Sequence, residues 1–277
     1  MRYSLAILFT VLSSCVFAQE RWAVVVGISD YAKTSYDING SNDIDIVVPM
    51  LMRNGFDREN ILTLVEAQAT KHNIKNTLYG LNLQEGDIVY FHFSGHGQNV
   101  TDVNGDEPER KDGCYDQSLV TYNAKSYIST SYKGEEHIVD DELNDWLWDI
   151  KHKIGDTGQL FVVLDCCYSG TGSRGEDDEV ERCISGILEL NIDDVTPRLK
   201  KVNPLYRIDW ICISACEATE RNLEYKHNGT SYGRLSYALS QLDSIFIEVE
   251  QLQEDLQIIY NDINPKGYKQ HVSVDFN

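Results

Sequence analysis

Two short segments of the chain contain residues that can carry out nucleophilic chemistry, and the first is centred on a histidine. Ser94-Gly95-His96-Gly97 directly follows an apolar run. Glycines on both sides of a histidine allow a sharp turn and leave a backbone N–H close to the imidazole, as a general base beside an oxyanion donor requires. A turn whose histidine only hydrogen-bonds to the backbone would have the same sequence, so this segment alone leaves both interpretations open.

The second segment contains a pair of adjacent cysteines. It runs from Asp165 to Gly170 (DCCYSG) and again directly follows an apolar run. A nearby imidazolium can hold a cysteine there as the reactive thiolate, although most unpaired cysteines are simply small buried hydrophobic residues. Because neighbouring parallel strands end at the same edge of a sheet, the two segments together favour a cysteine nucleophile with His96 as its base.

Alternating strands and helices must position these segments. Five short apolar runs rich in Val and Ile are predicted to be buried strands, and four segments of helical period are predicted to be helices. This alternation predicts an α/β fold with a mostly parallel sheet covered by helices on both faces. A closing helix and an edge strand are expected within residues 245–277. The predicted strands are 21–28, 60–65, 87–93, 159–164 and 210–214, and the predicted helices are 43–54, 70–82, 140–153 and 232–242.

The composition of the chain excludes several classes of protein. Its 277 residues include 44 Asp and Glu against 24 Lys and Arg, which gives a formal net charge of -20 at pH 7. A chain of this length can bury a large core, but it lacks the excess of basic residues that nucleic-acid binding needs. We therefore expect a folded protein with no nucleic-acid partner, whose charge favours calcium or basic peptides.

Residues 1–18 are predicted to be a signal peptide. Arg2 is followed by a short apolar run, and Val16-Phe17-Ala18 offers a small-residue cleavage site. The run is too short to span a bilayer, which needs about 20 apolar residues. The mature chain would then be one domain of residues 19–277, exported to the periplasm or secreted, with no membrane span. The alternative is a lipoprotein box at Cys15, where lipid would anchor the protein.

The motifs of the chain resemble, in order and spacing, those of the metacaspase branch of the caspase-like cysteine peptidases. The resemblance extends over nearly the whole mature chain. It implies a caspase-like (caspase-haemoglobinase) fold with a six-stranded sheet, and hydrolysis of peptide bonds that needs no cofactor for the chemistry. Caspases proper carry a different cysteine signature. The matching motifs are 42–43 (ND), 94–97 (SGHG), 112–116 (DGCYD), 140–143 (DDEL), 165–170 (DCCYSG) and 213–216 (ISAC).

Carried over to the matching positions, the resemblance implies a catalytic dyad. His96 resembles the catalytic base, and Cys167, the second cysteine of the pair, resembles the nucleophile. The N–H groups of Gly97 and Cys167 would then bind the oxyanion of the tetrahedral intermediate.

The resemblance also implies an acidic S1 pocket, the pocket for the substrate residue P1 that precedes the cleaved bond. Asp43, Ser94 and Asp165 match this pocket, which implies polypeptide substrates cut after Arg or Lys. For Asp43 the alternative is an acid favoured at a helix N-terminus. Two other functions stay open: a caspase-like peptidase with a different P1 preference, and a catalytically silent module that binds calcium or basic peptides.

Three aspartates match positions that bind calcium in related enzymes. These are Asp116, Asp140 and Asp141, and Ca²⁺ takes roughly 6–8 oxygen ligands. Asp140 and Asp141 would equally serve as capping residues of a helix. The chain departs from the family at Arg174, near which the family has a further carboxylate, and at Tyr168, where the family frequently has histidine. The resemblance implies stimulation by calcium, and the missing carboxylate near Arg174 argues against it.

Two long polar stretches, 98–136 and 171–207, are predicted to be loops, and both begin just after a candidate catalytic residue. Members of the family are often processed after basic residues in such loops, so self-cleavage is expected in the second. A monomer is expected, although no sequence feature determines the oligomeric state. The candidate cleavage sites are Arg174, Arg182, Arg198, Lys200, Lys201 and Arg207.

Overall fold

The centre of the molecule is a six-stranded sheet with the strand order β12-β9-β7-β3-β1-β2. The strands from β9 to β2 run parallel, and β12 (Ser273–Phe276) at the edge runs antiparallel to β9. The α/β class and the mostly parallel six-stranded sheet predicted from the sequence are therefore confirmed. This computed structural model describes residues 19–32, 36–102, 105, 115–168, 180–191, 209–217, 220–264 and 267–276.

The central strands form where apolar residues are continuous, because helices cover both faces of a parallel sheet. All seven residues of β3 are buried. No observed strand end differs from its predicted position by more than one residue. The strands are β1 (Arg21–Gly27), β2 (Ile61–Val65), β3 (Ile88–Ser94), β7 (Gln159–Asp165) and β9 (Ile211–Ser214).

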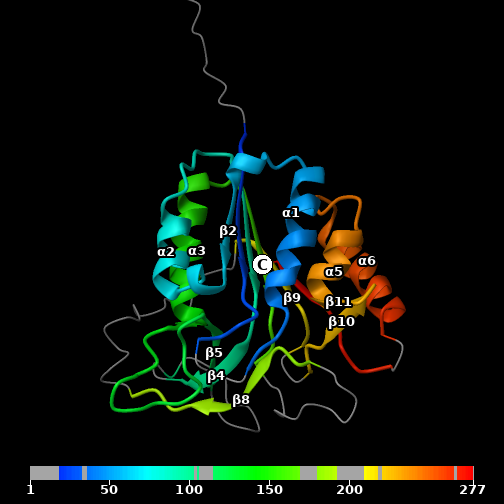
Figure 1. Ribbon diagram of the computed structural model, residues 1–277. Helices are drawn as coiled ribbons and strands as arrows, with labels where there is room; N and C mark the ends of the chain where they lie inside the picture. Colours follow the sequence, from blue (N-terminus) through cyan, green and yellow to red (C-terminus); the bar gives the residue numbers. More distant parts are fainter. Residues whose placement is uncertain are drawn as a thin grey trace, which may run out of the picture.

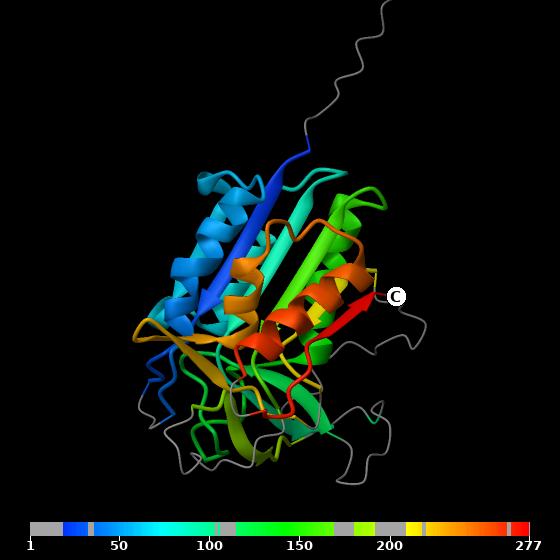
Figure 2. The same cartoon turned by 90° about the vertical axis from the view of Figure 1, so that its right-hand side faces the viewer.

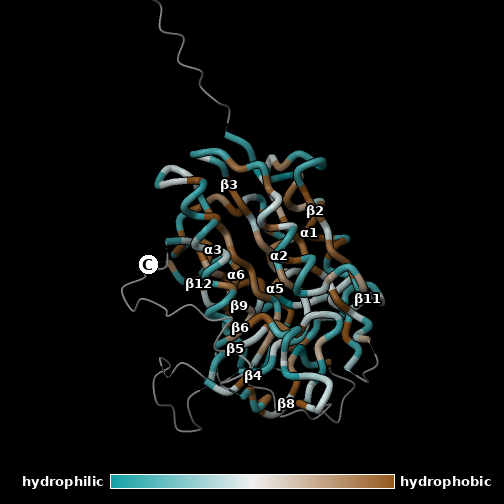
Figure 3. Tube along the Cα trace, turned by 90° about the vertical axis from the view of Figure 1, so that its left-hand side faces the viewer, coloured by the Kyte–Doolittle hydropathy of each residue, from teal (hydrophilic) through white to brown (hydrophobic). Residues whose placement is uncertain are grey.

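Helices form a layer on each side of this sheet (Figures 1 and 2). Figure 3 shows hydrophobic residues gathered on the strands between the two layers, as expected for a core built from both sheet faces. The helix of residues 44–53 ends before Gly55, whose φ of 81° is the left-handed conformation that commonly ends a helix. On one side lie α2 (Lys71–Tyr79) and α3 (Asp140–Ile154), and on the other lie α1 (Ile44–Arg53), α5 (Arg234–Gln241) and α6 (Val249–Asp262).

A second sheet lies at the carboxyl ends of the central strands, and it corrects one prediction (Figure 1). Parts of the stretches 98–136 and 171–207, which were expected to be loops, form strands in this four-stranded sheet. Their sequences are mixed: β4 reads GQNVT and β5 reads YDQSLV, so neither has the apolar run that identified the central strands. The strand order is β6 (His137–Val139), β5 (Tyr115–Val120), β4 (Gly97–Thr101) and β8 (Cys183–Leu188).

A two-stranded hairpin corrects the start of the last predicted internal helix. Residues 230–233 belong to β11 (Thr230–Gly233), which pairs antiparallel with β10 (Glu224–His227). Asn228 and Gly229 between them have φ values of 49° and 89°, the positive angles that a tight hairpin turn requires. The helix α5 therefore begins only at Arg234, directly after the hairpin.

The C-terminal region contains the expected closing helix and edge strand, which are α6 and β12 (Ser273–Phe276). Within the described ranges, no helix combines the length and the apolar character needed to cross a membrane. The predicted signal peptide and most of the stretch 171–207 lie outside the described residues.

Candidate active site

The histidine and cysteine segments meet at one edge of the central sheet. β3 and β7 are neighbours in parallel register, with Ser94 opposite Asp165. His96 and Cys167 each follow two residues later, and both are almost completely buried. The arrowheads of these strands point toward the four-stranded sheet in Figure 2, so the site lies between the two sheets.

The imidazole of His96 is positioned by a backbone carbonyl. Its Nε2 lies 2.7 Å from the carbonyl oxygen of Tyr36, which can only accept, so Nε2 carries the proton and Nδ1 has a free lone pair. Nδ1 has no hydrogen-bond partner among the residues that the structure describes. Burial lowers the pKa of His96 to about 4, so the imidazole is neutral at pH 7. A neutral Nδ1 can accept a proton and later return it to a leaving group.

Two backbone N–H groups converge on the carbonyl oxygen of Arg182. The N–H of Cys167 donates to it at 2.9 Å and that of Gly97 at 3.4 Å. They are the two groups that the family resemblance assigned to the oxyanion. A Cβ at Gly97 would lie 2.6 Å from the carbonyl oxygen of Cys167, so glycine is needed for this close approach. A peptide carbonyl of the chain itself therefore sits at the predicted oxyanion position.

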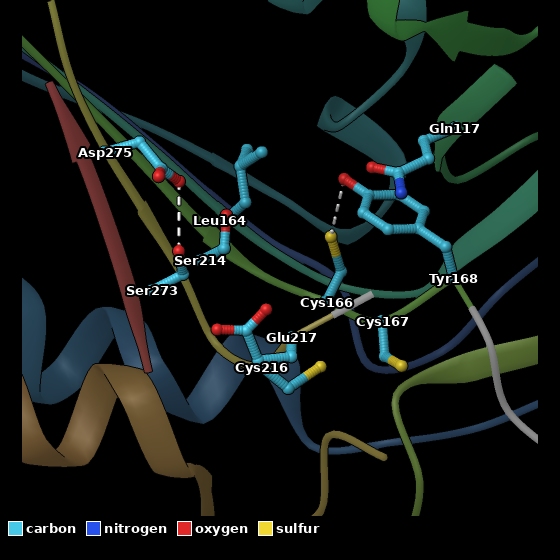
Figure 4. Close-up of a pocket in the computed structure, with 10 residues that line it drawn as sticks. All are labelled: Gln117, Leu164, Cys166, Cys167, Tyr168, Ser214, Cys216, Glu217, Ser273 and Asp275. Atoms are coloured by element: carbon cyan, nitrogen blue, oxygen red, sulfur yellow. Dashed lines mark hydrogen bonds between the residues drawn. The ribbon is translucent and has the colours of Figure 1, made fainter. Parts of the chain in front are cut away.

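Three cysteines lie close to one another in the site, and two of their thiols contact the same backbone carbonyl. Cys167 Sγ lies 2.9 Å from the carbonyl oxygen of Glu220, and Cys216 Sγ lies 3.5 Å from the same oxygen. The thiol of Cys166 instead points to the hydroxyl of Tyr168, 3.4 Å away. All three cysteines line one pocket, which has a volume of about 270 Å³. Figure 4 shows how they lie in it. The two members of the Cys166-Cys167 pair thus have different partners.

The guanidinium of Arg182 occupies a fully buried acidic pocket. Its Nη1 lies 2.7 Å from Asp43 Oδ2, 2.5 Å from Ser94 Oγ and 3.6 Å from Asp165 Oδ1. The hydroxyl of Ser94 donates in turn to Asp43. The side chains of Arg182 and both aspartates have 0% exposure. The structure therefore brings the three residues predicted for the S1 pocket together around one arginine, while their roles stay a prediction.

The pKa values of the two pocket aspartates are shifted in opposite directions. Burial raises the pKa of Asp43 to about 6, against the opposing effect of the Arg182 charge. Burial acts in the same direction on Asp165, but Arg182 and hydrogen bonds from Asn222 and Ser236 together hold its pKa below the usual value. Asn222 Nδ2 donates at 2.8 Å, and the N–H and hydroxyl of Ser236 donate at 2.8 and 2.7 Å. Asp165 is therefore a fixed negative charge in this pocket.

Two residues that sequence reasoning missed complete the pocket, and both belong to the β10–β11 hairpin. Glu224 Oε1 accepts from Nε and Nη2 of Arg182 at 3.3 and 3.2 Å. The N–H of Gly233 donates to Asp43 Oδ1 at 2.9 Å, and a Cβ there would overlap the Asp165 carboxylate and the guanidinium. The only sequence signal for these two residues was that Glu224 and Gly233 lie on either side of the Asn228-Gly229 turn.

The three aspartates matched to calcium positions lie on two neighbouring elements. Ser118 of β5 pairs with Val139 of β6, and the two strands are antiparallel. Asp116 comes two residues before Ser118 and Asp141 two residues after Val139, so both aspartates lie on the same side of this pair. Asp140 Oδ1 lies 3.2 Å from the N–H of Asp141 at the start of α3. Leaving aside the undescribed stretches, which include 106–114 and 169–179, no three His, Cys, Asp or Glu residues gather closely enough to hold a metal ion. The calcium role of these three aspartates stays a prediction.

A cysteine and a histidine lie at adjacent strand ends, and two N–H groups point at one peptide carbonyl. This is the arrangement expected of a cysteine peptidase with a caspase-like fold. Residues 21–173 match the family described as Metacaspase, peptidase C14 domain. The chain belongs to the metacaspase family, as its motifs predicted.

Curated relatives agree with this family, and a solved structure supports the fold. The chain is 36% identical over 166 residues to Metacaspase-2 of Arabidopsis thaliana, covering 56% of this chain and 36% of that protein. It is 30% identical over 161 residues to Metacaspase-1 of Eremothecium gossypii, covering 54% and 32%. The match thus spans about a third of the length of these relatives. A Geobacter sulfurreducens protein of known crystal structure, 17% identical, covers 93% of this chain and 94% of its own with a TM-score of 0.64, which supports the fold.

Proposed function

We propose that this protein is a cysteine endopeptidase that cuts after arginine, and that its first substrate is its own Arg182–Cys183 bond. The observation that carries the proposal is the placement of Arg182. Its guanidinium lies among Asp43, Asp165 and Glu224, while its carbonyl oxygen accepts from the N–H groups of Cys167 and Gly97. A P1 residue of a peptide substrate needs the same two sets of contacts.

In the proposed mechanism, the thiol proton of Cys167 passes to Nδ1 of His96 and the sulfur attacks the carbonyl carbon of Arg182. The N–H groups of Cys167 and Gly97 stabilise the negative oxygen that forms, and removing one such donor typically costs about 10²–10³ in rate. The C–N bond to Cys183 then breaks, and His96 protonates the leaving amine. Water hydrolyses the resulting thioester, which releases the Arg182 carboxylate and the Cys167 thiol.

The proposal is tested by incubating the full-length chain under reducing conditions and identifying its N-termini by mass spectrometry. A new N-terminus at Cys183 is expected in the wild type and is expected to be absent from Arg182→Gln, because glutamine lacks the charge that the pocket binds. The same preparations are assayed with fluorogenic peptides that end in Arg, Lys or Asp.

Each outcome of this test has a distinct meaning. An intact chain that nevertheless hydrolyses arginyl peptides would exclude self-cleavage at Arg182 and leave the peptidase standing. Hydrolysis of the aspartyl peptide instead would exclude the basic P1 preference. No hydrolysis at all, in folded protein with reduced thiols, would favour the silent binding module.

Arginine is proposed as the preferred basic residue because of Glu224. This carboxylate contacts Nε and Nη2 of Arg182, and lysine has no atoms that correspond to these groups. Glu224→Gln is expected to lower kcat/KM for arginyl peptides about tenfold, the loss of a hydrogen bond between charged groups, with a much smaller effect on lysyl peptides. Steady-state kinetics on matched Arg and Lys peptides measure the ratio. Glu59→Gln, which alters an exposed acid at the opposite end of the sheet, is the control and should leave the ratio unchanged.

Calcium stimulation and export are further parts of the proposal. Calcium is tested by repeating the peptide assay with added Ca²⁺ and with chelator, in the wild type and in Asp140→Asn. Export predicts a mature protein that begins at Gln19, which the mass of the protein isolated from its source would verify. If Cys15 carries lipid instead, the isolated protein will begin at that residue.

A further inference from the structure

The residues that precede Arg182 bind to the active-site edge as a short antiparallel strand. The N–H of Arg182 donates to the carbonyl of Asn222 at 3.0 Å, and the N–H of Glu224 donates to the carbonyl of Val180 at 3.0 Å. Glu181 and Leu223 form the antiparallel bridge between these two bonds. An extended peptide that adds to an exposed strand in this way gains affinity from its backbone and specificity from its side chains. Residues 180–182 therefore lie as the P3, P2 and P1 residues of a bound substrate would.

Side chains alternate along an extended strand, so the P2 side chain leaves the S1 pocket and meets different residues. The P2 residue is Glu181, and its Oε2 lies 3.1 Å from Nη2 of Arg221. The Glu181 side chain is only 6% exposed and that of Arg221 is 30% exposed. Burial raises the pKa of Glu181, and the charge of Arg221 opposes this effect. Arg221 is thus a charge partner of this nearly buried carboxylate.

We infer that Arg221 forms an S2 subsite that selects substrates with glutamate immediately before the cleaved arginine. This inference rests on the proposed function and adds the class of substrate, which is an extended polypeptide segment with the pattern Glu-Arg. Arg221 is held in place by its neighbours in the chain. The carboxylate of the preceding residue, Glu220, accepts hydrogen bonds from the N–H and Nδ1 of His271 at 2.6 and 2.7 Å, and the carbonyl of the following residue, Asn222, receives the P1 N–H.

The overall charge of the chain acts against this preference. A net charge of -20 attracts basic peptides and repels acidic ones at long range, and this effect weakens as salt is added. A preference for glutamate at P2 would therefore have to come from a local contact, and Arg221 provides the oppositely charged group at the right distance. Salt should weaken the pairing less than it weakens the general attraction for basic peptides, because the Glu181 side chain is nearly buried.

The test uses the full-length chain, allowed to complete self-processing, and three fluorogenic peptides that report only cleavage after arginine. Their sequences are Val-Glu-Arg, Val-Gln-Arg and Val-Lys-Arg, so that P3 and P1 match Val180 and Arg182. In the wild type, kcat/KM is expected to be about tenfold higher with Glu than with Gln at P2, and lowest with Lys, as a partly buried ion pair predicts. Arg221→Ala is expected to bring the Glu to Gln ratio close to one, and Arg221→Glu to invert the order so that Lys is preferred.

Two controls separate this inference from other effects. Lys226→Glu makes the same change of charge at an exposed position five residues away and should leave the P2 order as in the wild type. Hydrolysis of the Gln peptide shows that each Arg221 variant is folded and active. An equal rate for all three peptides in the wild type, or an unchanged order in Arg221→Glu, would overturn the S2 assignment while leaving cleavage after arginine intact. Failure to cleave any arginyl peptide would overturn both the proposed function and the S2 assignment.

Discussion

Replacement of Cys167 by alanine is expected to lower hydrolysis of arginyl peptides to background and to leave the bond after Arg182 intact. Removal of the nucleophile of a peptidase costs about 10⁶-fold in kcat, because the remaining groups bind the substrate but cannot form the covalent intermediate. The N–H of residue 167 is retained in the alanine variant, so the contact to the Arg182 carbonyl should persist. The uncut chain should therefore keep Arg182 in the acidic pocket.

Cys166→Ala is the matched control for this experiment. Cys166 is also buried and adjacent in sequence, but its thiol points to Tyr168 rather than toward Glu220. Activity should stay within a few-fold of the wild type. Alkylation by an arginyl chloromethylketone, followed by peptide mapping, identifies the reactive thiol directly. Label on Cys166, or loss of activity only in Cys166→Ala, would show that the nucleophile has been assigned to the wrong member of the pair.

Asp165→Asn is expected to lower kcat/KM for arginyl peptides by about 10²–10³. The substitution leaves a buried guanidinium without one of its compensating charges, and breaking a buried ion pair costs about 3–5 kcal/mol. Asp165 also accepts hydrogen bonds from Asn222 and Ser236. In the asparagine variant the side-chain NH₂ would replace one accepting oxygen, so a donor would face one of these donors. The loss should be much smaller for a peptide with a neutral P1 residue, which does not need the charge. Kinetics on both peptides measure the difference.

Asp87→Asn controls for the general effect of removing a buried carboxylate. Asp87 is 2% exposed and accepts from the N–H groups of Glu20 and Gln84 at 2.9 and 2.8 Å, but it precedes β3 and so lies at the opposite end of the sheet. Its loss should lower the thermal unfolding temperature and leave P1 specificity unchanged. If Asp165→Asn lowers activity equally for charged and neutral P1 residues, its role is structural and not that of a specificity residue.

The central sheet was predictable because its strands are buried on both faces. β1, β3 and β7 have continuous apolar sequences that differ sharply from the amphipathic helices between them. Parallel strands end at one edge, which brought His96 and Cys167 together in the prediction. The second sheet could not be predicted in this way, because β4 has a polar sequence and its partner β8 follows more than 80 residues later.

The acidic pocket was predictable only where family motifs covered it. Asp43, Ser94 and Asp165 each belong to a recognisable motif, whereas Glu224 and Gly233 lie in a hairpin that has none. Arg182 was one of six basic residues that were equally good candidates for self-cleavage. Nothing in its local sequence distinguishes it, because its selection depends on contacts to residues 139 and 88 positions away in the chain. The contact of His96 with the carbonyl of Tyr36 could not be predicted from sequence for a simpler reason, because every residue has a backbone carbonyl.

The arginine in the acidic pocket is covalently attached to the molecule that it would inhibit. A tethered group of this kind has an effective concentration on the order of millimolar, so a foreign peptide at micromolar levels competes poorly with it. A newly made chain would therefore be latent toward other proteins until the bond after Arg182 is cut and Arg182, which stays joined to the fragment that carries Cys167, leaves the pocket. The timing of activity would then be an intramolecular property, independent of how many copies of the chain are present.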